Sequence, residues 1–310
     1  LNIAGGGPSS WTATNEFTFG KDLMLDFLGC ANLLWSAHIV EPNELKEIVR
    51  SLVPSIRTGM RGKELPSEEG NITEPVDISA FLNFSKSAKD LSVDLSNLKS
   101  GDIKNRSAIF HIKETAATSG KCAIVVGSKG TGDNLSTGEV NGIKINEDVS
   151  SLIFLQSCAL PSGNQKSFFN VPNTFDSPDL LGWYEIVYED GFKTIVPIQY
   201  GLNVLEWNAA HKASGQASEA VMASQGDYSY EADAIDCSAN SQASPVTCFA
   251  FEWVNPRFGK VVKEVNLHGS VNYQSLLPEF DTPLYKPMAG NAILLFAISK
   301  VKKQERIMPR

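Results

Sequence analysis

Apolar residues follow two different periods along the chain, and the change falls near residue 65. Before it, apolar positions recur at helical spacing in GKDLMLDFLGCANLLWS and again in EPNELKEIVRSLVPSIRTG. This spacing predicts two amphipathic helices within residues 1–65. A stretch rich in Gly, Pro and charge follows, so we expect a linker over 66–74, a β-rich domain over 75–302 and a tail over 303–310.

The β-rich domain is a succession of short runs of strand-forming residues. Such runs, without long helical patterns between them, are typical of a β-sandwich or jelly roll. A parallel sheet would need helical crossovers, so we expect a mainly β fold. The ten predicted strands span 76–82, 106–112, 122–127, 141–145, 151–158, 183–189, 193–200, 246–253, 261–268 and 292–299.

Two of these runs flank Asp190-Gly191, which predicts a β-hairpin with a two-residue turn. In that register, Tyr184 and Tyr188 share a face with Lys193, Ile195 and Pro197, and the alternation does not decide which face is buried. Because Pro197 has no backbone donor, it predicts an edge strand or a bulge.

The overall charge narrows the choice of partner. The chain has 310 residues, a net charge of −8 and a pI near 5.1. Nucleic-acid binding needs clustered Lys and Arg, so neutral or sugar ligands fit better than polyanions. The longest apolar runs, such as NAILLFAIS, are shorter than the roughly 20 residues of a membrane helix. We therefore expect neither a nucleic-acid partner nor a membrane span.

The five cysteines show no C-x-x-C spacing and no partnering histidine cluster, so no metal site is predicted. Cys237 and Cys248 flank a polar loop and would pair in an oxidising compartment. Buried free thiols are the alternative, and the sequence favours it.

The helical segment carries a resemblance. The stretch LGCANLLWSAHIVEPNELKEIV resembles the closing part of the (β/α)₈ catalytic barrel in family 20 β-hexosaminidases and related glycoside hydrolases. The resemblance implies that Trp35 walls a sugar pocket and that a catalytic region precedes this chain. Ala37 stands where that family often has a sugar-binding Glu.

A second resemblance covers the β-rich domain. From EPVDISAFLN through GWYEIVYEDG and FAFEWVNPRFGKVVKEVNL to AILLFAISKV, the chain is similar to the galactose-binding-like β-sandwich appended to many bacterial hydrolases of glycans. This resemblance implies a jelly roll, which has a structural role in many such enzymes and binds sugar in some of them.

No catalytic residue is predicted. Glycoside hydrolysis ordinarily needs two carboxylates flanking the scissile bond, and no such pair stands at a recognisable barrel strand. The nearest acidic clusters are Asp176 with Asp179, and Glu231 with Asp233 and Asp236. Solvated loops explain both clusters, although a structural Ca²⁺ would also be compatible with them.

Aromatic residues are the better candidates for a binding site, because sugar rings stack on Trp while amides and guanidinium groups bind the hydroxyls. Trp207 follows the loop YGLNVLEW, and Trp253 is close in sequence to Asn255 and Arg257. With Trp35, these residues form the predicted site for a sugar or for the catalytic domain. Packing in the core is the alternative for both Trp207 and Trp253.

Three functions follow. The chain is first expected to be a non-catalytic accessory region of a glycan-degrading hydrolase, periplasmic or secreted rather than cytoplasmic. The alternatives are a stand-alone carbohydrate-binding module and a glycoside hydrolase active in its own right, with an acid pair built from the long loops. Whether the chain is itself an enzyme stays open.

Overall fold

The computed structural model describes residues 65–67, 71–86, 91, 93–113, 120–127, 138–159, 180–209, 232–257, 259–269 and 291–302. This part of the chain is mainly β, with every strand pair antiparallel and no α-helix. Its strands are β1 (Thr73–Pro75), β2 (Phe84–Ser85), β3 (Gly101–Asn105), β4 (Ala108–Ile112), β5 (Lys121–Gly127), β6 (Glu139–Glu147), β7 (Val149–Cys158), β8 (Leu180–Tyr188), β9 (Lys193–Gln199), β10 (Ala232–Asp236), β11 (Thr247–Val254), β12 (Val262–Gly269) and β13 (Ala292–Lys302).

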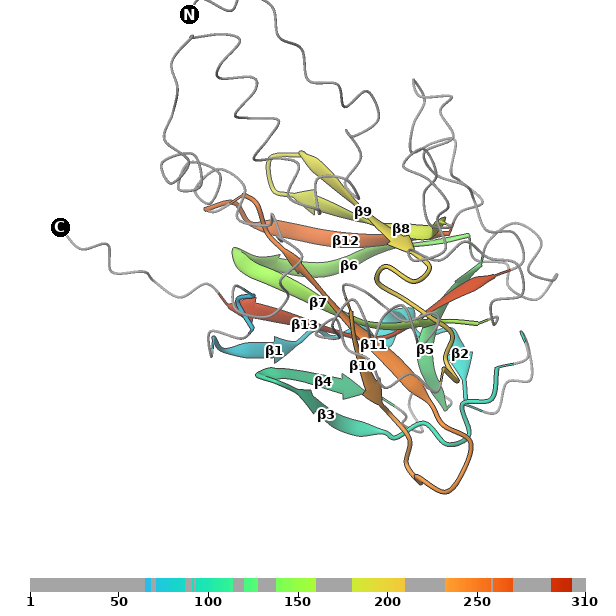
Figure 1. Cartoon of the computed structure of the whole chain (residues 1–310). Coiled ribbons are helices and arrows are strands. Elements are labelled where there is room, and N and C mark those ends of the chain that lie inside the picture. The colour runs from blue at the N-terminus through green and yellow to red at the C-terminus, as the bar shows by residue number, and fades with distance from the viewer. Residues whose placement is uncertain are drawn as a thin grey trace, which may run out of the picture.

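The strands form three sheets. A seven-stranded sheet has the order β10-β11-β7-β13-β5-β2, with β1 also paired to β13, and it curls into a half-barrel. A four-stranded sheet has the order β6-β12-β8-β9, and β3 pairs with β4. Figure 1 shows the four-stranded sheet on one side of the larger sheet and the β3–β4 hairpin on the other side.

The seven-stranded sheet is buried on both faces. Along β7, Leu152 and Phe154 belong to the hydrophobic cluster shared with the four-stranded sheet. Ile153 and Leu155 belong to a second cluster, shared with β3 and β4. This double burial explains why β5, β7, β11 and β13 are almost continuously apolar in sequence, since neither face of these strands has to be polar.

Nine of the ten predicted strands are confirmed, and the prediction for 76–82 is wrong. That stretch contains the 3₁₀ turn η2 (Ser79–Phe81). The backbone N–H of Ser79 donates to Asp77 Oδ1 at 3.0 Å, and Lys113 Nζ forms an ion pair with the same oxygen at 2.5 Å. A local bond from an Asp side chain to the backbone two residues later favours a turn over a strand.

The predicted β8–β9 hairpin is confirmed, but its two-residue turn is wrong. Val187 pairs with Lys193, and the N–H of Gly191, at φ 82°, donates to the carbonyl of Tyr188. The loop is therefore longer by one residue, with the glycine in the left-handed region. The extra residue reverses the faces of β9, so Val196 rather than Pro197 lies opposite Tyr184.

The hairpin places Tyr184, Ile186 and Tyr188 in the core cluster between the two sheets. The alternation did not decide which face of the hairpin packs in the core, and the structure shows that the face with the two tyrosines does. Pro197 lies on β9, an edge strand of the four-stranded sheet, as its missing donor predicted.

Several predictions fall outside the described residues: the two helices, Trp35, the barrel end and the tail over 303–310. The division of the chain at residue 75 stays a prediction. Within the range expected as a linker, β1 begins at Thr73, and the Ser67 N–H donates to the buried carboxylate of Glu252 at 3.2 Å. The chain is therefore attached to the sheets before residue 75.

Candidate functional site

The outer face of the four-stranded sheet carries two rows of polar and aromatic side chains. His268 on β12 lies opposite Glu139 on β6 and opposite Trp183 on β8. Two residues earlier on β12, Asn266 lies opposite Glu185 on β8. Alternation along each strand therefore brings these five side chains to one face.

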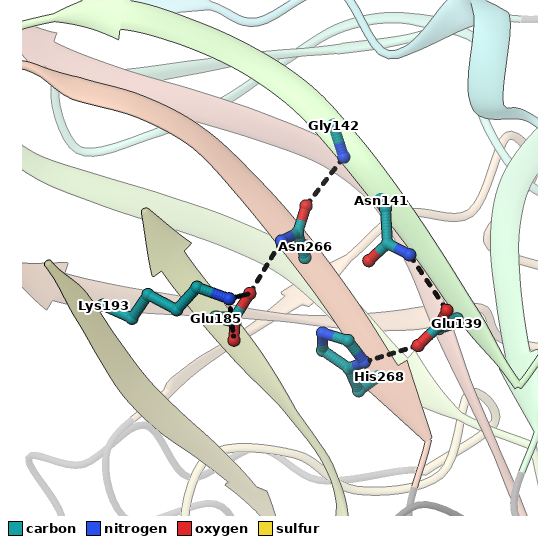
Figure 2. A network of polar contacts seen from close by, with 7 residues as sticks. All are labelled: Glu139, Asn141, Gly142, Glu185, Lys193, Asn266 and His268. Atoms are coloured by element: carbon teal, nitrogen blue, oxygen red, sulfur yellow. Dashed lines mark hydrogen bonds and ion pairs between the residues drawn. The ribbon is translucent and has the colours of Figure 1, made fainter. Parts of the chain in front are cut away.

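A chain of hydrogen bonds crosses this face from β6 to β9 (Figure 2). The N–H of Gly142 donates to Asn266 Oδ1 at 2.7 Å, and Asn266 Nδ2 donates to Glu185 Oε1 at 2.8 Å. Lys193 Nζ then donates to both oxygens of Glu185, at 3.1 Å each. Each polar group in this row of hydrogen bonds is thus held by a neighbour from another strand.

A β-bulge on β6 makes the first of these bonds. Val265 pairs with Ile143 and Leu267 with Val140, so Asn141 and Gly142 together oppose one residue of β12. Gly142 has φ 86°, a conformation that glycine adopts without strain. The bulge directs the Gly142 N–H at the Asn266 side chain instead of at a strand carbonyl.

The imidazole of His268 has contacts on two sides. Its ring stacks on Trp183 with centroids 5.1 Å apart and 13° between planes, and its Nδ1 lies 3.1 Å from Glu139 Oε2. Asn141 Nδ2 donates to the other oxygen of Glu139 at 3.0 Å. The buried Nε2 of His268 has no hydrogen-bond partner among the residues that the structure describes.

The side chains on this face range from buried to half exposed. Trp183 and Asn266 are buried, the side chains of His268 and Glu185 are 14% and 17% exposed, and those of Glu139 and Lys193 are 47% and 55% exposed. Trp183 therefore supports the imidazole and offers no open ring face. The groups of this face that are most exposed are the carboxylate of Glu139 and the ammonium of Lys193, at the two ends of the network.

Asn255 and Arg257, both predicted as ligand residues, are brought together at the turn of the β8–β9 hairpin. The hydroxyl of Tyr188 donates to Asn255 Oδ1 at 2.7 Å, and Asn255 Nδ2 donates to the carbonyl of Val149 at 2.9 Å. Arg257 donates to both oxygens of Asp190, at 3.1 and 2.8 Å. Both side chains thus attach the hairpin to the chain that follows β11.

Two pKa values are shifted at this turn, for different reasons. The Arg257 guanidinium lowers the pKa of Asp190 to about 2. Burial raises the pKa of the Tyr188 hydroxyl to about 12. The guanidinium carbon also lies 4.7 Å from the ring centroid of Tyr188 and 4.4 Å from that of Phe192, so Arg257 contacts both an anion and two aromatic rings.

Trp207 and Trp253 lie in different hydrophobic clusters. Trp207 is 6% exposed in the cluster shared with β3 and β4, and its backbone bonds to Cys158 and Thr247. Trp253 is 9% exposed in the cluster between the two larger sheets. Both indoles are packed in this structure, and contact of either one with a sugar or a catalytic domain stays a prediction.

The described acidic residues of the predicted clusters have local partners. Asp233 forms an ion pair with Arg106 at 3.2 Å, and Asp236 accepts a hydrogen bond from the Ser238 N–H at 2.9 Å. Within the described ranges, no three His, Cys, Asp or Glu side chains come together as a metal site. In the same ranges, no helix is long and apolar enough to cross a membrane.

Sequence reasoning missed the polar face. Its signal is the alternation of Trp183 with Glu185 and of Asn266 with His268, each two residues apart in a predicted strand. Alternation alone does not show that β12 pairs with β8. That pairing brings Asn266 beside Glu185 and His268 beside Trp183. Apart from Gly142 itself, nothing in the sequence indicates the bulge.

Comparisons with protein-family models, with curated proteins and with solved structures gave no match to this chain.

Proposed function

We propose that this chain is the non-catalytic C-terminal region of a glycan-degrading hydrolase, and that its β-sandwich binds carbohydrate through the outer face of the four-stranded sheet. In this proposal the sandwich is a jelly roll of the galactose-binding-like kind. It follows the end of a family 20 β-hexosaminidase-like barrel in a periplasmic or secreted enzyme. The sequence resemblances support the parent enzyme, and the antiparallel sheets agree with the fold.

The observation that carries the binding proposal is the hydrogen-bonded row Gly142–Asn266–Glu185–Lys193. Sugars present several hydroxyl groups at fixed spacing, each of which both donates and accepts. A row of amide, carboxylate and ammonium groups on adjacent strands offers the complementary pattern. Because the groups are already fixed by one another, a ligand loses little free energy in ordering them.

The charges on this face also fit an uncharged ligand. Lys193 neutralises Glu185, and Glu139 lies beside His268 and Asn141. A polyanion would meet the carboxylates of Glu139 and Glu185 on a chain whose net charge is −8. Neutral glycans avoid this repulsion and still receive charge-assisted hydrogen bonds.

Calorimetric titration with neutral oligosaccharides tests the proposal. The panel contains β-glucan, galactan and N-acetylhexosamine oligomers. Lys193→Ala and Glu139→Gln change exposed side chains and should leave the melting temperature within experimental error. Each should weaken binding about tenfold, the usual cost of losing one charged hydrogen bond.

Lys302→Ala is the matched control. Lys302 is 36% exposed and pairs with Glu74 on β1, and both belong to the seven-stranded sheet rather than to the sheet that carries the polar face. Its loss should leave sugar affinity unchanged. If no oligosaccharide binds the folded chain, or if Lys302→Ala weakens binding as much as Lys193→Ala, the proposed face is wrong. If no oligosaccharide binds, the remaining proposal for the sandwich is an architectural role within the parent enzyme.

A further inference from the structure

Two buried thiols lie on neighbouring strands at one edge of the seven-stranded sheet. Cys237 directly follows β10, and its N–H donates to the Val246 carbonyl at 2.8 Å. Cys248 on β11 pairs with Ile235, two residues earlier on the neighbouring strand. By the two-residue alternation of strands, both thiols point to the same face. Both are fully buried in the cluster shared with β3 and β4.

The two thiols lie diagonally across β10 and β11, since Ile235 is opposite Cys248 and the Cys237 N–H bonds to Val246. Burial first, and then the neighbouring Cys237 thiol, raise the pKa of the Cys248 thiol. Residues in this diagonal relation ordinarily have Cα atoms about 7–8 Å apart. A disulfide needs about 4.4–6.8 Å. Closing the bond therefore requires a movement of the β10 backbone that brings the two Cα atoms closer.

The edge position of β10 permits that approach. β10 has five residues and is the terminal strand of its sheet, paired with β11 alone in the sheet order. Residues 239–245, which join Cys237 to β11, are exposed. Short edge strands and exposed loops open more readily than central strands, so Cys237 is the first of the two thiols that solvent can reach.

We propose that Cys237 and Cys248 form a disulfide when the protein meets a disulfide oxidant such as oxidised glutathione. The Cys237 thiolate attacks one sulfur of the oxidant, forms a mixed disulfide and expels the first glutathione thiolate. The Cys248 thiolate then attacks the Cys237 sulfur and expels the second. Two protein thiols are oxidised, one glutathione disulfide is reduced to two thiols, and the two protein protons go to the released thiolates.

The burial of Cys248 determines at which stage the disulfide forms. Removal from water raises the pKa of its thiol well above the ordinary value, so the fully folded chain holds little thiolate. Oxidation is then expected during folding or during local opening of β10, and not in the closed sheet. The inference does not depend on carbohydrate binding.

Mass spectrometry of the full chain after incubation with oxidised glutathione tests the inference. The intact mass should fall by two hydrogens, and a protease digest should contain a peptide pair joined through Cys237 and Cys248. Brief exposure to low urea, which opens edge strands, should accelerate the reaction. A digest that joins Cys248 to Cys122 or Cys30, or that contains only glutathione adducts, would overturn the assignment.

Melting curves of variants provide the second measurement. The oxidised wild-type chain should melt at a higher temperature than the reduced chain, because the bond restricts the unfolded state. Cys158→Ala removes another buried thiol and should keep this difference, whereas Cys237→Ser should abolish it. If Cys237→Ser does not fold, the wild-type digest alone decides. An unchanged redox difference in a folded Cys237→Ser chain contradicts the inference.

Discussion

Trp207→Ala distinguishes a packed indole from an exposed binding platform, the two roles that the sequence left open for this residue. Trp207 is 6% exposed and is surrounded by the cluster that contains Phe110, Leu155 and Val246. A Trp side chain buries roughly 150–250 Å², and at about 25 cal/mol per Å² this corresponds to roughly 4–6 kcal/mol. Measured truncations of buried Trp give about 3–5 kcal/mol, and we expect that range here.

Urea unfolding followed by far-UV circular dichroism measures this loss. For a domain of this size, about 3–5 kcal/mol corresponds to a fall in melting temperature of roughly 6–20 °C. Phe192→Ala is the matched control, because Phe192 is 52% exposed and its loss should cost less than about 1 kcal/mol. A Trp207→Ala chain within about 1 kcal/mol of wild type would refute the packing described here.

Three further predictions concern the hairpin and the sheet beneath the polar face. Because Arg257 lowers the pKa of Asp190 to about 2, this pair stabilises the fold above the ordinary carboxyl pKa, and the stabilisation is lost as pH falls from about 4 to 2. Acid titration of Asp190→Asn should therefore show a shallower loss of stability over that window, and an identical slope contradicts the pair. Gly191→Ala should cost about 1–2 kcal/mol in urea unfolding, because its φ of 82° disfavours a Cβ, and an unchanged midpoint would exclude the observed turn. A Cβ on Gly182 would collide with the backbone oxygen of His268, so Gly182→Ala should cost about 3 kcal/mol, the upper end of the usual range for overpacking, or prevent folding. A Gly182→Ala chain with wild-type stability would contradict the close approach of β8 and β12.

A fourth test concerns catalysis. Under the proposed accessory role, the isolated chain should release no product from aryl β-N-acetylhexosaminides or galactosides. Turnover that survives repurification and disappears when a loop carboxylate is replaced would instead favour an enzyme active in its own right.

The strands that sequence reasoning found are those whose hydrophobic pattern comes from burial. Strands β5, β7, β11 and β13 are covered on both faces and so appear as apolar runs. The missed strands β1, β2, β3 and β10 have two to five residues each, too few for a period to emerge. Two of them also pair with strands distant in sequence, β1 with β13 and β2 with β5. Short segments of this kind are fixed by tertiary contacts.

The hairpin shows a second limit. Asp190-Gly191 correctly marked the reversal of the chain, yet the same pair fits a two-residue turn and a longer loop with the glycine in the left-handed region. In the structure, Asp190 is held by Arg257, which lies far along the sequence, and its Oδ1 accepts the Phe192 N–H at 3.1 Å. The choice between turns, and therefore the face of every residue on β9, was not contained in the local sequence.

The candidate site was the least predictable part. The Trp residues were chosen for their stacking surface, and a large core requires the same apolar area, so the residue type could not separate the two roles. Asn255 was chosen as a ligand for hydroxyl groups, and its amide instead binds Tyr188 and Val149 inside the protein. The polar face depends on which strands are neighbours, and a single sequence does not specify that order.

Nuclear magnetic resonance of side-chain amides tests the central claim most directly, because Asn141 and Asn266 belong to the proposed binding face. Their amide signals, assigned by Asn→Asp variants, are followed during titration with the tightest-binding neutral oligosaccharide. The account predicts saturable shifts at both residues with the affinity found by calorimetry. The amide of Asn97, which bonds to the backbone of Asn240 and Ser244, should not move. Shifts at Asn97 without shifts at Asn141 and Asn266, or no shifts at all, would contradict carbohydrate binding at this face.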